Sequence, residues 1–119
     1  MNLSELKNLL NCPFCNLQAG AKEVKSICAS DLMSEVLLLA DRESVIVTNL
    51  VNLQAIRTAE MVESSCIVFV RGKTPTKEMV TLAEKNGIAL LVTEFDMFET
   101  CGILYGKGLK HKKVAHDNH

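Results

Sequence analysis

Residues 45–70 read VIVTNLVNLQAIRTAEMVESSCIVFV, and this stretch decides the fold. Its two ends, 45–48 and 66–70, are short apolar runs rich in β-branched residues, which is typical of buried parallel strands. Between them, apolar side chains recur at helical spacing: Leu53, Ile56, Ala59 and Val62. Asn52 just before these residues is a good N-cap. The pattern predicts a strand, a helix and a second strand, which indicates a parallel βαβ unit.

The same alternation continues toward the C-terminus. Thr74, followed by a proline suited to a first helical turn, predicts the start of a helix that ends at Gly87. The apolar run 88–93 predicts a third strand. Asp96, with a glutamate three residues later, predicts a capping box for a helix that runs through Tyr105.

The first 40 residues are less regular. Ser4 is a candidate cap for a helix over 5–10, and residues 24–28 are the best candidate for a strand. Asp31 is a candidate cap for a helix over 32–40. With the units that follow, these elements predict an α/β fold: a compact, three-layer-like domain with a small, mainly parallel sheet flanked by helices.

Length and composition indicate one globular domain. The chain has 119 residues, of which 48% are hydrophobic and 23% charged. We expect the α/β domain to occupy residues 1–106. Residues 107–119 lose the periodic pattern and contain four lysines and all three histidines. We expect them to form a flexible tail.

Charge and cysteine content exclude several classes of protein. A net charge of −1 argues against a nucleic-acid partner, which needs a broad basic surface. The longest apolar runs, such as 36–40, are too short to cross a bilayer, so no membrane association is expected. The first residues lack the basic start and apolar run of a signal peptide. Five cysteines, an odd number, are then most simply reduced thiols of a cytoplasmic protein.

Polar residues gather where the predicted strands end. In open α/β sheets, ligands bind beyond the carboxyl ends of the strands. These ends provide two hydroxyls, an amide, two cations and a glycine that leaves the backbone open: Thr48, Asn49, Arg71, Gly72, Lys73 and Thr93. The set predicts a site for a phosphate, a carboxylate or a nucleotide. The alternative is that Arg71 and Lys73 are solvated charges that pair with acidic residues of the neighbouring loop, at 94 and 96.

No catalytic residue, cofactor or metal is predicted. All three histidines lie in the tail, and the sequence lacks a complete phosphate-binding loop. Arg57 and Thr58, in the helix that follows the first strand, are candidate interface residues, because small neighbours allow close packing of helices. Arg57 is equally suited to a solvated surface.

The pair Cys12 and Cys15 leaves two further alternatives. A zinc site would need Cys28 and a tail histidine as well, because structural zinc takes four ligands. A redox dithiol would have to follow a strand and begin a helix, whereas Cys12 follows a predicted short helix. A proline between the two thiols also suits an edge strand or a tight loop. We therefore interpret both as reduced thiols in the wall of the domain.

Four stretches together suggest a family. They are ASDLMSEV at 29–36, TNLVNLQAIRTA at 48–59, VRGK at 70–73, and Thr93 with MFETCGILY at 97–105. With these stretches the chain resembles the small stand-alone DRTGG-domain proteins of anaerobic bacteria and archaea, over residues 24–109. It departs from them at Thr48-Asn49, where members commonly have Thr-Gly. Because asparagine tolerates left-handed backbone angles, the turn can survive this change.

The resemblance implies a compact α/β domain similar to the N-terminal, non-catalytic domain of HPr kinase, with a tendency to dimerise. In larger proteins such domains accompany CBS domains in regulated pyrophosphatases, and they also occur in phosphotransacetylases. The leading hypothesis is therefore a non-catalytic regulatory or assembly module. We expect it to be a homodimer that binds a small anionic metabolite or nucleotide and contacts a partner enzyme of anaerobic metabolism. A thiol- or metal-based redox accessory protein that uses Cys12 and Cys15, and a purely structural subunit, remain alternatives.

Overall fold

A computed structural model describes residues 1–16 and 19–112. The elements are, in order, α1 (Leu3–Leu9), β1 (Ser26–Ala29), α2 (Met33–Leu39), β2 (Ser44–Thr48), α3 (Leu53–Val62), β3 (Cys66–Phe69), α4 (Lys77–Lys85), β4 (Ala89–Val92), α5 (Met97–Gly106) and β5 (Lys110–His111). None of the helices in these two ranges is long and apolar enough to cross a membrane.

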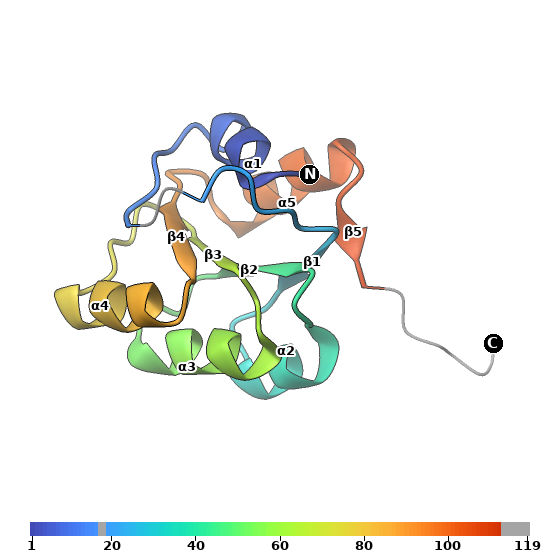
Figure 1. Ribbon diagram of the computed structural model, residues 1–119. Coiled ribbons are helices and arrows are strands. Elements are labelled where there is room, and N and C mark those ends of the chain that lie inside the picture. Colours follow the sequence, from blue (N-terminus) through green and yellow to red (C-terminus); the bar gives the residue numbers. More distant parts are fainter. Residues whose placement is uncertain (17–18, 113–119) are drawn as a thin grey trace.

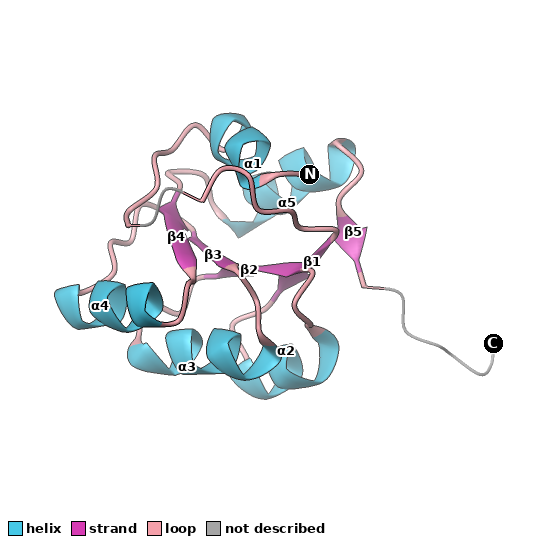
Figure 2. Ribbon diagram, viewed as in Figure 1, coloured by secondary structure: helices cyan, strands magenta, loops and turns pink. Residues whose placement is uncertain are grey.

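The strands form one five-stranded sheet in the order β4-β3-β2-β1-β5, and every neighbouring pair is parallel. Figure 1 shows the chain stepping along the sheet from β1 to β4 and then returning through α5 to the opposite edge. Helices α2, α3 and α4 cover one face, and α1 and α5 cover the other (Figure 2). The predicted α/β fold, with helices on both sides of a parallel sheet, is confirmed.

The core consists of two apolar clusters, one on each face of the sheet. Successive residues of a strand point to opposite faces, so Val45 and Val47 pack toward α1 and α5, whereas Ile46 packs toward α2 and α3. All five residues of β2 are buried. Burial on both faces is why the central strands β2 and β3 are largely apolar instead of alternating.

Helix starts agree with the prediction in part. Asn52 and Asp96 cap α3 and α5, each through a hydrogen bond from the backbone N–H three residues later. The other predicted caps are wrong. Asn2, not Ser4, caps α1, in a capping box with Glu5. The cap of α4 is Thr76, two residues after Thr74, and its hydroxyl accepts the Met79 N–H at 3.2 Å. Asp31 likewise does not cap α2, which begins after Leu32 without a side-chain cap.

The sheet extends into the segment for which we expected a flexible tail. Leu109 is buried in the core cluster beneath α1 and α5. Lys110 and His111 form β5 beside β1, and the Lys112 ammonium lies 3.6 Å from an Asp41 carboxylate oxygen. The domain therefore continues to residue 112, beyond the expected boundary at 106. The remainder of the predicted tail, 113–119, lies outside the described residues.

Candidate functional site

The connections after β3 and β4 leave the sheet toward opposite faces. The chain passes from β3 to α4 on the face that also carries α2 and α3, and from β4 to α5 on the other (Figure 1). Ligands of open α/β sheets bind at the carboxyl ends of the strands, where neighbouring connections diverge in this way. This point lies at the loop after β3, 70–76, and the loop after β4, 93–96. We call this edge of the sheet, with the Thr48-Asn49 turn after β2, the carboxyl edge.

Hydrogen bonds join these two loops to each other. The Arg71 N–H donates to the Phe95 carbonyl and the Gly72 N–H to the Thr93 carbonyl, both at 2.8 Å. Arg71 and Gly72 have left-handed backbone angles, with φ of 61° and 68°. A Cβ atom on Gly72 would lie 2.8 Å from a carboxylate oxygen of Glu94. We expected Gly72 to leave the backbone open to a ligand. Instead, it allows a tight turn against the Glu94 carboxylate, and its N–H is already bonded.

The two threonines of the predicted site also bond within the protein. Thr48 and Thr93 are fully buried. The Thr48 hydroxyl donates to an Asp31 carboxylate oxygen at 3.0 Å, and the Thr93 hydroxyl donates to the Leu10 carbonyl at 2.9 Å. Both residues therefore hold the loops in position, and neither presents a free hydroxyl at the surface.

Asp31 belongs to the carboxyl edge, although the sequence indicated a helix cap. One of its carboxylate oxygens accepts both the Thr48 hydroxyl and the Asn49 backbone N–H, the latter at 2.7 Å. The Leu32 N–H is bonded instead by the hydroxyl of Ser30, at 3.0 Å. The signal that could have identified Asp31 is its place just after β1, the parallel neighbour of β2.

The two cations of the predicted site lie at the surface of the protein. Arg71 and Lys73 are exposed, and neither forms an ion pair with any residue in the described ranges. The alternative that they pair with Glu94 or Asp96 is therefore not seen. The Lys73 ammonium lies 3.5 Å from the Asn49 carbonyl, which brings the ends of β2 and β3 together. The Asn49 side-chain oxygen is buried, and no described residue donates a hydrogen bond to it.

The two predicted interface residues on α3, Arg57 and Thr58, differ in their exposure. The Arg57 side chain is exposed, and its guanidinium lies 3.9 Å from a Glu60 carboxylate oxygen one turn later. Thr58 is only 4% exposed. Of the two, only Arg57 can contact a partner directly.

The cysteine pair does not have the setting of a reactive dithiol. Burial, and to a lesser degree the neighbouring Cys15 thiol, raises the pKa of Cys12 to about 11. Burial also raises the pKa of Cys15. Both thiols are therefore protonated at neutral pH, whereas nucleophilic cysteines need a lowered pKa. No three histidine, cysteine or acidic side chains of the described chain lie where they could hold a metal ion. Two tail histidines, at 116 and 119, lie outside it.

The segment around these cysteines instead covers an edge of the sheet. The Cys15 N–H donates to the Leu90 carbonyl at 2.8 Å, and Phe14 forms an isolated antiparallel bridge with Leu91. The side chain of Asn16 donates to the Ile88 carbonyl and accepts the Leu90 N–H, both at 2.9 Å. Uncovered edge strands invite pairing with other chains, so this segment protects β4.

Comparisons with known proteins support the fold. The chain matches no protein-family model and no curated protein. It is similar to a crystal structure of the CBS and DRTGG domains of the regulatory region of Clostridium perfringens pyrophosphatase, complexed with its activator diadenosine tetraphosphate, with a TM-score of 0.70 and 16% sequence identity. The match covers 87% of this chain and 45% of that one, so the chain spans less than half of that regulatory region. At this identity the likeness shows the fold alone: the chain shares the fold of a part of that structure.

Proposed function

We propose that this protein is a non-catalytic regulatory module of the DRTGG type, which acts as a homodimer and binds a small anionic metabolite or nucleotide at the carboxyl edge. The observation that carries the proposal is the pair of exposed cations, Arg71 and Lys73, beside Asn49 at the point where the connections of the sheet diverge. A guanidinium and an ammonium are the two side-chain groups that best recognise phosphate and carboxylate oxygens.

The remaining residues of this edge give the cations a defined position. Arg71 is held by the backbone bond to Phe95, and Lys73 follows the tight turn at Gly72. Neither cation is neutralised by an acidic side chain of the described chain. The similar regulatory region from Clostridium perfringens was crystallised with a nucleotide activator, and that activator is polyanionic. A nucleotide is therefore the ligand class to test first.

Regulation would follow from a shift between conformations. A ligand that contacts both Asn49 and Arg71 bridges the loops that lead into α3 and α4. If its affinity differs between two arrangements of these helices, binding shifts the population toward one of them. The family resemblance implies a partner enzyme of anaerobic metabolism. This enzyme would then respond to the changed arrangement of α3 and α4. This last step stays a prediction.

Thermal unfolding with a ligand panel tests the proposal. The panel contains mononucleotides, dinucleoside polyphosphates, acetyl phosphate and inorganic phosphate. A ligand present at about 100 times its Kd stabilises the fold by about 2.7 kcal/mol, which raises the Tm of a domain of this size by on the order of 10 °C. The substitution Arg71→Ala removes the guanidinium, so we expect this shift to disappear.

Arg42→Ala is the matched control. Arg42 is also an exposed arginine, but it lies just before β2, at the end of the sheet where the strands begin. The ligand-induced shift should survive this change. An unchanged Tm across the whole panel would contradict binding at the carboxyl edge. So would an equal loss of the ligand-induced Tm shift in Arg71→Ala and Arg42→Ala.

A further inference from the structure

The helix layer formed by α2, α3 and α4 has an apolar ridge on α2. Leu38 is 77% exposed and Leu37 is 44% exposed, although Met33 and Val36 of the same helix are buried. Leu32, just before the helix, is also exposed. Leu39, at 38%, is the least exposed leucine of this helix. Removing such side chains from water is favourable, and four exposed leucines on and beside one short helix indicate an interaction surface. We call Leu32, Leu37 and Leu38 the α2 ridge.

The same layer has a groove between α3 and α4. Its volume is about 440 Å³, and its lining combines two leucines with three cations and an acid: Leu53, Leu82, Arg57, Lys77, Lys85 and Glu78. We call this the α3–α4 groove. Its lining therefore has an excess of positive charge over an apolar base. By contrast, the α2 helix and the loop before it carry Asp31 and Glu35 and no basic residue.

We infer that a second copy of this chain covers the layer, with the α2 ridge of each copy in the α3–α4 groove of the other. The inference rests on the homodimer of the proposed function and names its surface. Helix α3 contacts both α2 and α4 and so lies between them. A twofold axis parallel to α3 brings the ridge of one copy opposite the groove of the other. Both contacts then form at once, as an isologous interface requires.

Two observations favour a second copy over a different protein. The ridge and the groove are complementary in charge, since leucines on a segment that carries two acids meet a groove lined by two leucines and three cations. They also lie on the same layer, so a single symmetric contact covers both. A different partner that fills the groove would leave the leucines of the ridge exposed. Arg57, a candidate interface residue from the sequence, is one of the residues that line the groove.

Sedimentation velocity of the full chain over a concentration series tests the inference. We expect a dimer for the wild type. Leu38→Lys places a cation against the cations of the groove and should raise the dimer Kd about tenfold or more. Leu38→Glu removes the same apolar contact but faces those cations, so its Kd should rise less. Because Leu38 is largely exposed, both variants should retain the wild-type circular dichroism spectrum.

Phe98→Lys is the matched control. Phe98 is 86% exposed on α5, in the opposite helix layer, so the dimer should survive its substitution. A dimer that Phe98→Lys dissociates and Leu38→Lys does not would overturn this surface but keep the homodimer. An equal rise in the dimer Kd for Leu38→Lys and Leu38→Glu would also overturn the ridge-in-groove contact, because it would indicate that the two ridges contact each other. A wild-type monomer at all concentrations rejects the homodimer, while the ligand-induced Tm shift still tests the carboxyl edge separately.

Discussion

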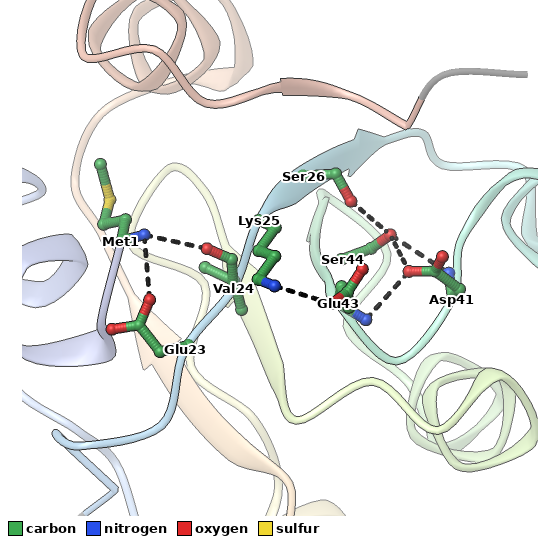
Figure 3. Close-up of polar contacts among 8 residues, drawn as sticks. All are labelled: Met1, Glu23, Val24, Lys25, Ser26, Asp41, Glu43 and Ser44. Carbon is green, nitrogen blue, oxygen red and sulfur yellow. Dashed lines mark hydrogen bonds and ion pairs between the residues drawn. The ribbon is translucent and has the colours of Figure 1, made fainter.

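The two edges of the parallel sheet use similar residues in different ways. We call the end of the sheet at which the strands begin the amino edge. Here Ser26 and Ser44 begin neighbouring strands, and their hydroxyl oxygens lie 3.0 Å apart in the interior. Ser44 also donates to an Asp41 carboxylate oxygen at 3.2 Å and accepts the Asp41 N–H at 3.1 Å. Figure 3 shows these contacts beside the Lys25–Glu43 ion pair. Every polar group named here has a partner within the protein.

At the carboxyl edge, an aspartate and two threonines also bond internally, but two cations are left over. Asp31 accepts the Thr48 hydroxyl, much as Asp41 accepts that of Ser44. Arg71 and Lys73 have no acidic partner among the residues described. A hydroxyl–carboxylate hydrogen bond therefore stabilises the fold at both ends of the strands. The two charges outside these hydrogen bonds, which form no ion pair among the described residues, are the groups that we propose as ligand contacts.

The largest effect on stability is expected at the amino edge, from Ser44→Ala. The change leaves the buried hydroxyl of Ser26 and the Asp41 N–H without this partner. It should lower the free energy of unfolding by about 2 kcal/mol, because unsatisfied buried groups keep their full desolvation cost. Urea unfolding at an unchanged m-value measures it. Ser34→Ala, at an exposed site on α2, should stay within about 0.5 kcal/mol of the wild type.

Gly72→Ala tests how tightly the carboxyl edge is built. A Cβ in a left-handed backbone costs about 1–2 kcal/mol, and here it also displaces the Glu94 carboxylate. The Tm should fall accordingly. Gly102→Ala is the control with the opposite sign: its Cβ points into open space on α5, and alanine favours a helix over glycine by up to about 1 kcal/mol. Equal destabilisation by the two substitutions would show that the turn at Gly72 is not special.

Asp31→Ala should cost about 1 kcal/mol of unfolding free energy, since it removes the acceptor of the Thr48 hydroxyl and of the Asn49 N–H near the surface. Asp31→Asn retains a side-chain oxygen and should lose less. Chemical denaturation of the three proteins side by side provides the measurement. If alanine and asparagine behave alike, the carboxylate does not hold the β1 and β2 ends together.

The smallest effect is expected from Arg71→Ala, which should change the free energy of unfolding by less than about 0.5 kcal/mol in the absence of ligand. The guanidinium forms no ion pair in the described part of the chain, so its removal breaks no strong contact. Arg42→Ala at the opposite edge should behave in the same way. A large loss for Arg71→Ala alone, measured by urea unfolding, would indicate a structural role and weaken the assignment of Arg71 to ligand binding.

Much of the fold could be predicted because its signals are local. The stretch 45–70 contains two strands and a helix. The strands are buried on both faces and are therefore apolar, whereas the helix is buried on one face and is therefore amphipathic. Asn52 and Gly87 mark a helix start and a helix end through their own backbone and side-chain chemistry.

Other features depend on contacts between distant segments. Thr74 and Thr76 are equally good helix caps by residue type, and only the fold shows that Thr76 caps α4. Asp31 has the residue type of a cap, but the pairing of β1 with β2 brings it to the end of β2 instead. The cysteine pair resembled a chemical site, yet its segment pairs with β4, more than 70 residues away. Within the predicted ligand site, burial of Thr48 and Thr93 and the approach of Glu94 to Gly72 could be seen only in the folded chain.

Local signals in the sequence were sufficient to predict the alternation of strands and helices from residue 45 to residue 105, because periodicity and capping act within a few residues. The sequence also located the residues at the strand ends, since parallel strands bring these ends to one edge. Only the tertiary structure decided that β5 joins the sheet beside β1 and that Asp31 binds the end of β2. It also separated the internally bonded residues of the carboxyl edge from the free cations, because hydrogen-bond partners and burial depend on which distant segments meet.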